Sequence, residues 1–371
     1  MKFSSLQENL AEGLQIVSRA VPTKGSLPIL SNVYISTESG RIKLAATDLA
    51  TTIMTYVGAS IDKKGEATVP AKLLKDFISN LSPGTVDILL EDDTFHVHAT
   101  KSKSKFNSTH AEDFPELPEP SITNHILELD TKPFHEAISA VAFSSGNDTG
   151  RPILTGTLVK SENGEITIAA TDGYRLSEKI LKVNTDQQDF TAVIPTKTLT
   201  EVSRIFSKEE NPIKFTLSED DNQVIFLSGD TYVSTRIIDG QYPPYKQIIP
   251  PDTSIKASFS TEEFIEAVKL TSVFASSGDS GNAVKLILDP TKQHIKITSL
   301  SEEMGEHEST IPANVEGEPT EIAFNVKYLL DFLNNIKGSE IYLETNGSIS
   351  PCIFRTKEHE NYRHIIMPLQ I

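Results

Sequence analysis

The chain has 371 residues, of which 38% are hydrophobic, and its 34 Lys and Arg against 51 Asp and Glu give a formal net charge of −17. This apolar content excludes a disordered or collagen-like chain, and the length predicts two or three domains because one core seldom grows beyond about 250–300 residues. A single cysteine, Cys352, excludes an intrachain disulfide, no segment has the roughly 18 consecutive apolar residues of a membrane span, and we expect a soluble protein of the cytoplasm.

The first predicted element is an amphipathic helix that recurs along the chain. Its apolar stripe has helical spacing at Leu6, Leu10, Leu14, Val17 and Val21. The stripe recurs at Phe134, Ile138 and Val141, and again at Phe264, Val268 and Thr271. Phe134 follows Leu10 by 124 residues, and Phe264 follows Phe134 by 130. Near-equal spacing of this kind indicates an internal repeat.

The second predicted element is a β-hairpin that ends in the tetrapeptide Ala-Ala-Thr-Asp. Residues 28–35 lead through a glycine-containing turn to residues 41–48, and residues 152–159 lead through a similar turn to residues 165–172. Alternating segments joined by such turns predict paired strands. The tetrapeptides end at Asp48 and Asp172, again 124 residues apart. A weaker third copy lies at residues 283–288 and 294–299.

The third predicted element is a second helix, entered by an apolar residue, then Pro or Asn, any residue, and Lys. The three copies begin at residues 69, 194 and 324 and place Lys72, Lys197 and Lys327 in equivalent positions. Proline suits a helix start because it has no N–H to satisfy, and the Asn side chain can cap the first turn. Strand-like segments follow at residues 86–90, 213–217 and 341–344.

Together these elements predict an α+β fold made of three copies of one unit, each with a helix, a hairpin, a second helix and further strands. The composition shifts toward Pro and acidic residues at 112–120 and toward Pro at 249–253, which predicts linkers there. We therefore expect units at residues 1–124, 125–253 and 254–371.

Few residues suggest catalysis. Asp48 and Asp172 could form the carboxylate pair of a repeat-built enzyme, but their equivalent positions favour a local role in strand-ending turns. His359 and His364 could be metal ligands, and a solvated loop is the favoured interpretation of their charged surroundings. Cys352 has no activating neighbour in the sequence, and neither a P-loop nor a GxGxxG motif occurs. We expect no catalytic residue, no metal site and no cofactor.

Further short motifs are spread over all three expected units. They are Met1-Lys-Phe3, Leu27-Pro-Ile-Leu30, Thr47-Asp-Leu49, Val69-Pro-Ala-Lys72, Thr171-Asp-Gly-Tyr-Arg-Leu176, Asp239-Gly-Gln-Tyr-Pro243, Phe324-Asn-Val-Lys-Tyr328 and Met367-Pro-Leu-Gln-Ile371. Together they resemble the bacterial sliding clamp family, the beta subunits of DNA polymerase III. The resemblance implies a head-to-tail dimer that forms a ring, with helices lining a central hole and antiparallel sheets forming the outer wall. It implies a non-catalytic processivity factor that encircles duplex DNA and tethers the replicative polymerase.

The partners implied by the resemblance are duplex DNA of any sequence, a second copy of the chain, the DNA polymerase III catalytic subunit, the clamp loader and other proteins with clamp-binding peptides. No membrane partner is implied. A net charge of −17 disfavours a nucleic-acid partner at first sight, because phosphate contacts rest on Lys and Arg. A ring resolves this objection if acid covers its outer wall while lysines face the hole.

The resemblance also assigns a groove for partner peptides to the second and third units. Its residues here are Leu154, Thr171, Gly173, Tyr174, Arg175, Leu176, Pro243, Ile248, Asn325, Tyr328, Ser350, Ile365, Ile366, Met367, Pro368 and Leu369. Tyr174 stands where the family often has His, Gln247 replaces a frequent Arg, and Gln370 replaces a frequent basic residue. An apolar groove with a Met and a few polar groups suits short, varied peptides.

Two further sets of residues follow from the resemblance. The expected DNA contacts are Lys24, Lys72, Arg151 and Lys197, and the repeat adds Lys327. The expected dimer interface comprises Phe106, Val273 and Phe274, which should be exposed in a single chain. The alternative function is a repeat-built protein-interaction scaffold that does not bind DNA.

Overall fold

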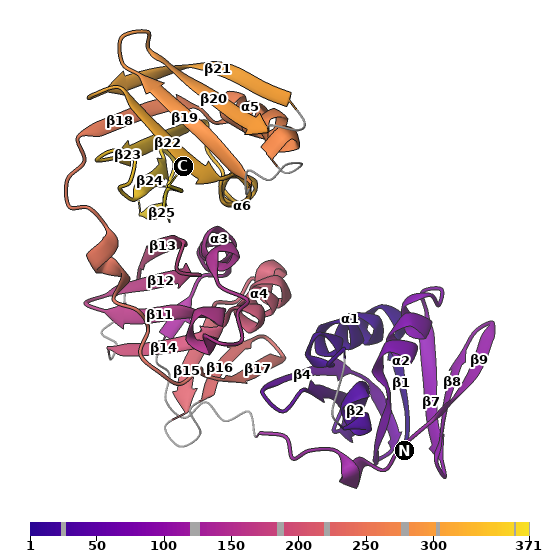
Figure 1. The fold of residues 1–371 in the computed structure, drawn as a ribbon. Helices are drawn as coiled ribbons and strands as arrows, with labels where there is room; N and C mark the ends of the chain where they lie inside the picture. Colours follow the sequence, from indigo (N-terminus) through magenta and orange to yellow (C-terminus); the bar gives the residue numbers. More distant parts are fainter. Residues whose placement is uncertain are drawn as a thin grey trace. The chain divides into compact units, whose positions relative to one another are not determined.

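The computed structural model describes residues 1–23, 27–118, 127–183, 189–218, 223–275, 282–301, 305–359 and 361–370 (Figure 1). The chain forms two compact units, the first from Met1–Lys132 and Glu201–Ile237 and the second from Pro133–Thr200 and Ile238–Ile371. The second sequence repeat therefore contributes to both units, and the boundaries at residues 124 and 253 stay a prediction. No helix within the described ranges is long and apolar enough to cross a membrane.

The elements recur in the predicted order of helix, hairpin strands, second helix and further strands. The first repeat contains β1 (Lys2–Leu6), α1 (Gln7–Val17), β2 (Asn32–Glu38), β3 (Arg41–Thr47), β4 (Thr51–Gly58), β5 (Ser60–Lys63), β6 (Glu66–Pro70), α2 (Ala71–Ser79), β7 (Thr85–Glu91), β8 (Thr94–Ala99) and β9 (Ser102–Asn107). The second contains β10 (Leu127–Leu129), α3 (Thr131–Val141), β11 (Gly156–Glu162), β12 (Glu165–Thr171), β13 (Arg175–Lys182), β14 (Phe190–Pro195), α4 (Thr196–Ile205), β15 (Ile213–Ser218), β16 (Gln223–Ser228) and β17 (Thr231–Arg236). The third contains β18 (Ile255–Ser260), α5 (Thr261–Ala275), β19 (Ala283–Asp289), β20 (His294–Ser301), β21 (Gly305–Glu316), β22 (Thr320–Asn325), α6 (Val326–Asn335), β23 (Glu340–Thr345), β24 (Cys352–Thr356) and β25 (Tyr362–Ile366).

Two sequence predictions are wrong at their edges. The expected strands do not begin at the prolines, because Pro28–Ser31 and Pro152–Thr155 form single 3₁₀ turns before β2 and β11. Proline has a fixed φ and no N–H to donate to a sheet ladder, which favours this turn over a strand. The first helix is shorter than its stripe, because Leu6 ends β1 with 54% of its surface exposed.

All strand pairs in the described part of the chain are antiparallel. The first unit has one sheet in the order β5-β1-β7-β8-β9 and a second in the order β10-β15-β16-β17-β4-β3-β2-β6. The second unit has a single continuous sheet in the order β14-β11-β12-β13-β25-β24-β23-β18-β21-β20-β19-β22. With helices packed on antiparallel sheets, the fold is α+β as predicted.

Strand pairs join consecutive repeats inside each unit. In the first unit, β4 of the first repeat pairs with β17 of the second. In the second unit, β13 of the second repeat pairs with β25 of the third. Each of these pairs is called a seam below. A seam joins the strand that follows the hairpin of one repeat, β4 or β13, to the last strand of the next repeat, β17 or β25.

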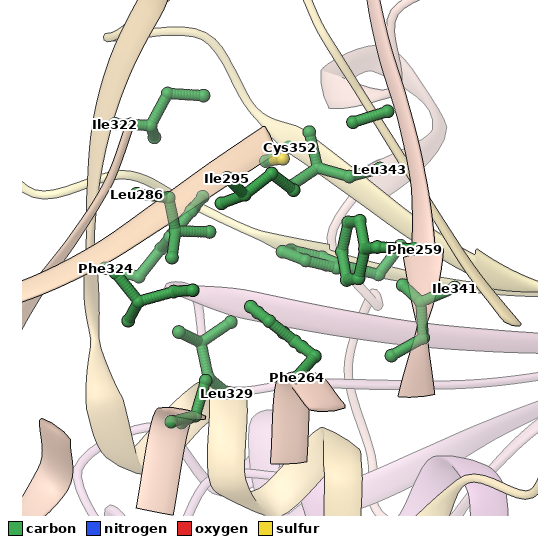
Figure 2. Packing of buried hydrophobic residues seen from close by; sticks show 14 of the residues in the cluster. Phe259, Phe264, Leu286, Ile295, Ile322, Phe324, Leu329, Ile341, Leu343 and Cys352 are labelled. Atoms are coloured by element: carbon green, nitrogen blue, oxygen red, sulfur yellow. The ribbon is translucent and has the colours of Figure 1, made fainter. Parts of the chain in front are cut away.

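The core of the third repeat shows how the amphipathic helices are used. The helix α5 packs on β20 and β21 and contacts α6. Figure 2 shows Phe264 of α5 and Leu329 of α6 pointing toward strand side chains such as Phe324 and Ile341. These four residues are fully buried, and burying a side chain of this size contributes about 1.5–3 kcal/mol. The predicted stripe residues Val268 and Thr271 are buried with them.

The C-terminal residues His364 and Cys352 are core residues. The solvated-loop interpretation is wrong for His364, which is fully buried in β25, stacks on Phe332 and hydrogen-bonds through Nδ1 with the Ser177 hydroxyl at 2.8 Å. Burial, with a smaller contribution from Arg175, lowers the pKa of His364 to about 3. Burial also raises the pKa of the Cys352 thiol, so neither group is set up as a cationic acid or a thiolate at neutral pH.

Candidate partner-binding groove

The Ala-Ala-Thr-Asp tetrapeptides build turns with the same hydrogen-bond pattern at the ends of β3 and β12. Asp172 Oδ1 accepts hydrogen bonds from the backbone N–H groups of Tyr174 and Arg175 at 2.9 and 3.0 Å. Asp48 Oδ1 accepts from the N–H groups of Ala50 and Thr51 at 3.0 and 2.7 Å. Both aspartates are therefore the turn-forming residues that the sequence predicts.

The second turn carries a glycine where the first carries leucine. Gly173 has a φ of +96°, a left-handed conformation, and a Cβ atom there would lie 3.2 Å from an Arg151 guanidinium nitrogen. Leu49 occupies the equivalent position with a φ of +74°. A side chain is strained in this conformation, so glycine both relaxes the turn and leaves the surface beside it open.

Arg175 joins this turn to the third repeat. The residue is only 8% exposed. Its guanidinium forms ion pairs with Asp172 through Nε at 3.1 Å and with Asp331 of α6 through Nη1 at 2.5 Å. It also lies 4.6 Å from the ring centroid of Tyr328, in cation–π geometry. Two of its N–H donors and the face of its guanidinium thus contact residues of its own chain, which favours a role in shaping the site.

A groove of about 760 Å³ opens beside the turn, within the range of ligand pockets of roughly 300–1,000 Å³. The predicted residues that line it are Leu154, Thr171, Gly173, Pro243 and Ile248. The sequence reasoning missed Ile153, Gln241, Pro244 and Tyr245, which also line it. The run Tyr-Pro-Pro-Tyr at residues 242–245 was a usable signal, because consecutive prolines make a rigid wall.

The wall formed by this run is held from behind. The Tyr245 hydroxyl donates to Glu178 Oε2, and Glu178 Oε1 accepts from Arg363 Nε at 2.6 Å. Glu178 is 1% exposed. Burial, together with the Glu178 carboxylate, raises the pKa of Tyr245, so the tyrosine stays a neutral donor. The Tyr242 hydroxyl donates to the Ala169 carbonyl at 3.3 Å.

Other predicted groove residues lie outside the lining of this cavity. The N–H of Met367 donates to the Tyr174 carbonyl at 2.9 Å, which places the half-exposed tail beside a tyrosine that is 60% exposed. The tail continues through Pro368 to Leu369, whose N–H bonds the Ala323 carbonyl. Leu176, Ile365 and Ile366 are buried strand residues, Asn325 caps α6 by accepting from the Lys327 N–H at 3.0 Å, and Ser350 is half-buried in the turn before β24.

The predicted DNA contacts fall into three groups. Lys72, Lys197 and Lys327 are all exposed and each is the second residue of its helix, α2, α4 and α6 respectively. Arg151 lines the groove and bonds Asp148 through Nε at 3.2 Å. Lys24 lies outside the described residues.

The predicted interface residues differ in exposure. The expectation that Phe106 is exposed is wrong, because it is 6% exposed and packs edge-on against Phe77 at 5.5 Å between ring centroids. Val273 is 63% exposed. Phe274 is half-buried and stacks on His307 of β21 at 5.4 Å. In the described part of the chain, no cluster of three or more His, Cys, Asp or Glu is placed to hold a metal ion.

Three family profiles match the chain in order along its length. The DNA polymerase III beta subunit N-terminal, central and C-terminal domains match residues 1–118, 128–244 and 246–370. The beta sliding clamp of Synechococcus elongatus is 31% identical over 379 residues, and that of Bacillus subtilis is 28% identical over 381, each alignment covering 100% of both chains.

Solved structures agree with these relatives. The crystal structure of the DNA polymerase sliding clamp from Bacillus subtilis has a TM-score of 0.94 at 28% identity, covering 100% of this chain and 99% of that one. The Thermotoga maritima DNA polymerase III beta subunit has a TM-score of 0.93 at 25% identity, with the same coverage. The chain therefore belongs to the family of bacterial beta sliding clamps, the beta subunits of DNA polymerase III.

Proposed function

We propose that two copies of this chain close head to tail into a ring around duplex DNA and that the groove tethers the DNA polymerase III catalytic subunit to it. As a family member, the chain is a DNA sliding clamp, a processivity factor without catalytic activity. The clamp loader and other proteins with clamp-binding peptides are further expected partners, and the cytoplasm is the expected location. The observation that carries the ring is the repeated seam between consecutive repeats.

Extending the seam pattern leaves two matching strand edges. In the third repeat, the strand that follows the hairpin is β21. Its residues 305–312 pair only with β20 among the described residues. The last strand of the first repeat is β9, which ends its sheet. An edge strand presents unpaired N–H and C=O groups to another strand, and a head-to-tail contact that closes forms a ring. A third seam between β21 of one chain and β9 of the next would pair the N–H and C=O groups of both edge strands.

The register on β21 follows from its neighbour β20. Ala169 of β12 pairs with Glu178 of β13, and Thr298 of β20, at the equivalent position, pairs with Glu308 of β21. Glu308 is therefore the equivalent of Glu178, whose partner across the seam is Arg363.

The register on β9 follows from β17. Phe106 and Thr235 each precede the last residue of a six-residue strand. Across the two seams, Thr235 pairs with Thr51 and Ile366 pairs with Arg175, and both partners lie three residues after an Ala-Ala-Thr-Asp aspartate. Phe106 is therefore the equivalent of Ile366, and the residues before it align with those before Ile366.

In this register Lys103 of one chain faces Glu308 of the other, and Lys105 faces Glu306. All four side chains are exposed in the single chain. The seam of the second unit supports the assignment, because its equivalent residues Arg363 and Glu178 already form an ion pair at 2.5 Å. Opposite charges that face each other across strands stabilise the pairing, and like charges destabilise it.

The three equivalent lysines support a duplex in the hole. Lys72, Lys197 and Lys327 occupy the first turn of their helices, where the positive end of the helix dipole makes a cation unfavourable. Helix stability therefore does not account for them. A phosphate placed there gains from both the lysine and the dipole, and contacts to phosphates alone leave a ring free to slide.

Truncating Ile248 of the groove lining and Tyr174 beside the C-terminal tail, two large exposed side chains, should abolish tethering while leaving the fold intact. In the double variant Tyr174→Ala, Ile248→Ala, the truncated side chains are 60% and 43% exposed, so the melting temperature should stay close to that of the native chain. Exposed aromatic anchors of this kind often contribute about 2 kcal/mol or more to binding. Primer extension by the cognate polymerase and loader on a long circular template should give products about as short as those made without the clamp.

The matched control is Leu27→Ala with Leu49→Ala, two leucines of the first repeat that are 48% and 49% exposed. This variant should extend primers as far as the native chain. Full-length products with the groove variant would show that the polymerase is held elsewhere.

A further inference from the structure

The two internal seams each carry a cavity, and the two cavities are equivalent in the repeat. The cavity in the first unit, called the acidic seam cavity, has a volume of about 450 Å³ and is lined by residues of α1, β4, the segment after α4 and the turn before β17. The cavity in the second unit, called the basic seam cavity, has about 220 Å³ and is lined by residues of α3, β13, the end of α6 and the turn before β25. Glu12 and Glu136 line them at positions 124 residues apart, as do Thr55 and Lys179.

The two cavities differ in charge although they share their architecture. The acidic seam cavity is lined by the carboxylates of Glu12, Glu209 and Asp230 and by no Lys, Arg or His within the described residues. Burial, followed by the charges of Glu12 and Asp230, raises the pKa of Glu209. An anion would therefore be repelled from this cavity.

The basic seam cavity has the opposite balance. Lys179 and Lys337 line it with two histidines, His135 and His359, and the only carboxylate in its described lining is Glu136. The nearby Glu358 is engaged elsewhere, because its Oε1 accepts from the Ser339 N–H at 2.9 Å and from the Ser339 hydroxyl at 2.8 Å.

Lys179 is the residue that points to a ligand. It is half-buried, and within the described residues it has no ion pair, whereas the partly buried Lys285 and Lys296 pair with Glu321 and Glu308 at 3.1 and 3.0 Å. Burial lowers the pKa of Lys179, and the charge of Glu136 opposes this shift without cancelling it. A partly desolvated ammonium costs free energy until an anion compensates it.

The pKa of His359 responds to the same positive potential. Its pKa is lowered by burial and then by Lys179, with a smaller effect of Lys337, against the opposing effects of Glu136 and Glu358. An anion bound between the two lysines would reverse this effect and raise the pKa of His359.

We propose that the basic seam cavity binds a backbone phosphate of the encircled duplex, with Lys179 and Lys337 as its cationic contacts. This inference rests on the ring described under Proposed function. Because the acidic seam cavity repels phosphate, the duplex is held at one internal seam of each chain and not at the other. Such a contact reads no bases, so it orients the ring on DNA without stopping it from sliding.

The test measures the salt dependence of duplex binding by the full chain, using fluorescence anisotropy of a labelled duplex of about 40 bp. Removing one phosphate contact should reduce the slope of log affinity against log salt concentration by about 0.9. The variant Lys179→Gln, Lys337→Gln should therefore have a slope shallower by about 1–2 and bind roughly tenfold more weakly at about 0.1 M salt. The control Lys256→Gln, Lys357→Gln removes two exposed lysines outside the cavity and changes the net charge equally; it should keep the slope of the native chain.

A second readout follows His359 by NMR in the chain labelled with ¹³C at histidine Cε1. Duplex should raise the pKa of His359 in the native chain and leave it unchanged in the Lys179→Gln, Lys337→Gln variant. A native slope in that variant would overturn the proposal. A His359 response to inorganic phosphate but not to duplex would also overturn it, by showing a site for free anions. Neither outcome would contradict the proposed ring if the native chain is retained on circular DNA.

Discussion

Two charge-reversed variants are expected to be monomeric alone and to dimerise only with each other. The first is Lys103→Glu, Lys105→Glu on β9, and the second is Glu306→Lys, Glu308→Lys on β21. A head-to-tail dimer has two contacts between β9 of one chain and β21 of the other, called junctions. In a dimer of either variant, both junctions would place like charges opposite one another in the proposed register. Like-charge juxtaposition across an interface costs several kcal/mol, so each variant should dimerise at least about 100-fold more weakly than the native chain.

Mixing the two variants restores complementarity at both junctions. In a head-to-tail heterodimer, one junction joins the two reversed strands and the other joins the two native strands. Light scattering coupled to size exclusion should therefore show monomers in each separate sample and dimers in the mixture. Native mass spectrometry should find only the mixed dimer.

A control and two contrary outcomes make this experiment specific. The control Lys132→Glu, Lys357→Glu reverses two exposed lysines, one on α3 and one in the turn after β24, and should leave the dimer unchanged. Native-like dimers of either reversed variant alone would show that β9 and β21 do not meet in this register. An isologous dimer, which pairs β9 with β9, would respond to the two variants differently and would not be rescued by mixing.

Replacing Arg175 should destabilise the second unit more than any surface change described above. Arg175→Ala removes a guanidinium that is 8% exposed and leaves Asp172 and Asp331 without their shared partner. Breaking a buried ion pair by removing one member typically costs about 3–5 kcal/mol. The urea midpoint for unfolding of this unit, followed by tyrosine fluorescence, should therefore fall well below that of the native chain.

The matched control is Arg151→Ala, which also removes an arginine paired with an aspartate three residues away. Its side chain is 51% exposed, and exposed pairs contribute about 0–1 kcal/mol. Equal shifts of the midpoint in the two variants would mean that burial of Arg175 has no energetic consequence, contrary to the role assigned to it.

The local parts of the fold could be predicted from the sequence because their causes are local. The turn at Asp172 forms from hydrogen bonds to residues two and three positions away, and the same pattern of hydrogen bonds recurs at Asp48. The start of α6 is likewise local, because the Asn325 side chain accepts a hydrogen bond from the N–H of Lys327, two residues further along the chain. These interactions need no knowledge of the rest of the chain.

The parts that the sequence did not reveal depend on distant contacts. Phe106 is buried because Phe77 lies beside it, and His364 is buried because β25 pairs with β13 from another repeat. Arg151 lines the groove because the chain returns over it at residues 239–248. Strand pairing between repeats is set by packing over the whole unit, and no periodicity within one strand encodes its neighbour.

Retention on DNA tests the ring most directly. The native chain is loaded by its clamp loader onto a nicked circular plasmid, separated from free protein on a sizing column, and then exposed to a restriction enzyme that cuts the plasmid once. A ring that encircles the duplex should stay with the circle at high salt and leave once the DNA is linear. Equal retention on circular and linear DNA, or none on either, would contradict a sliding clamp and favour a scaffold that does not encircle DNA.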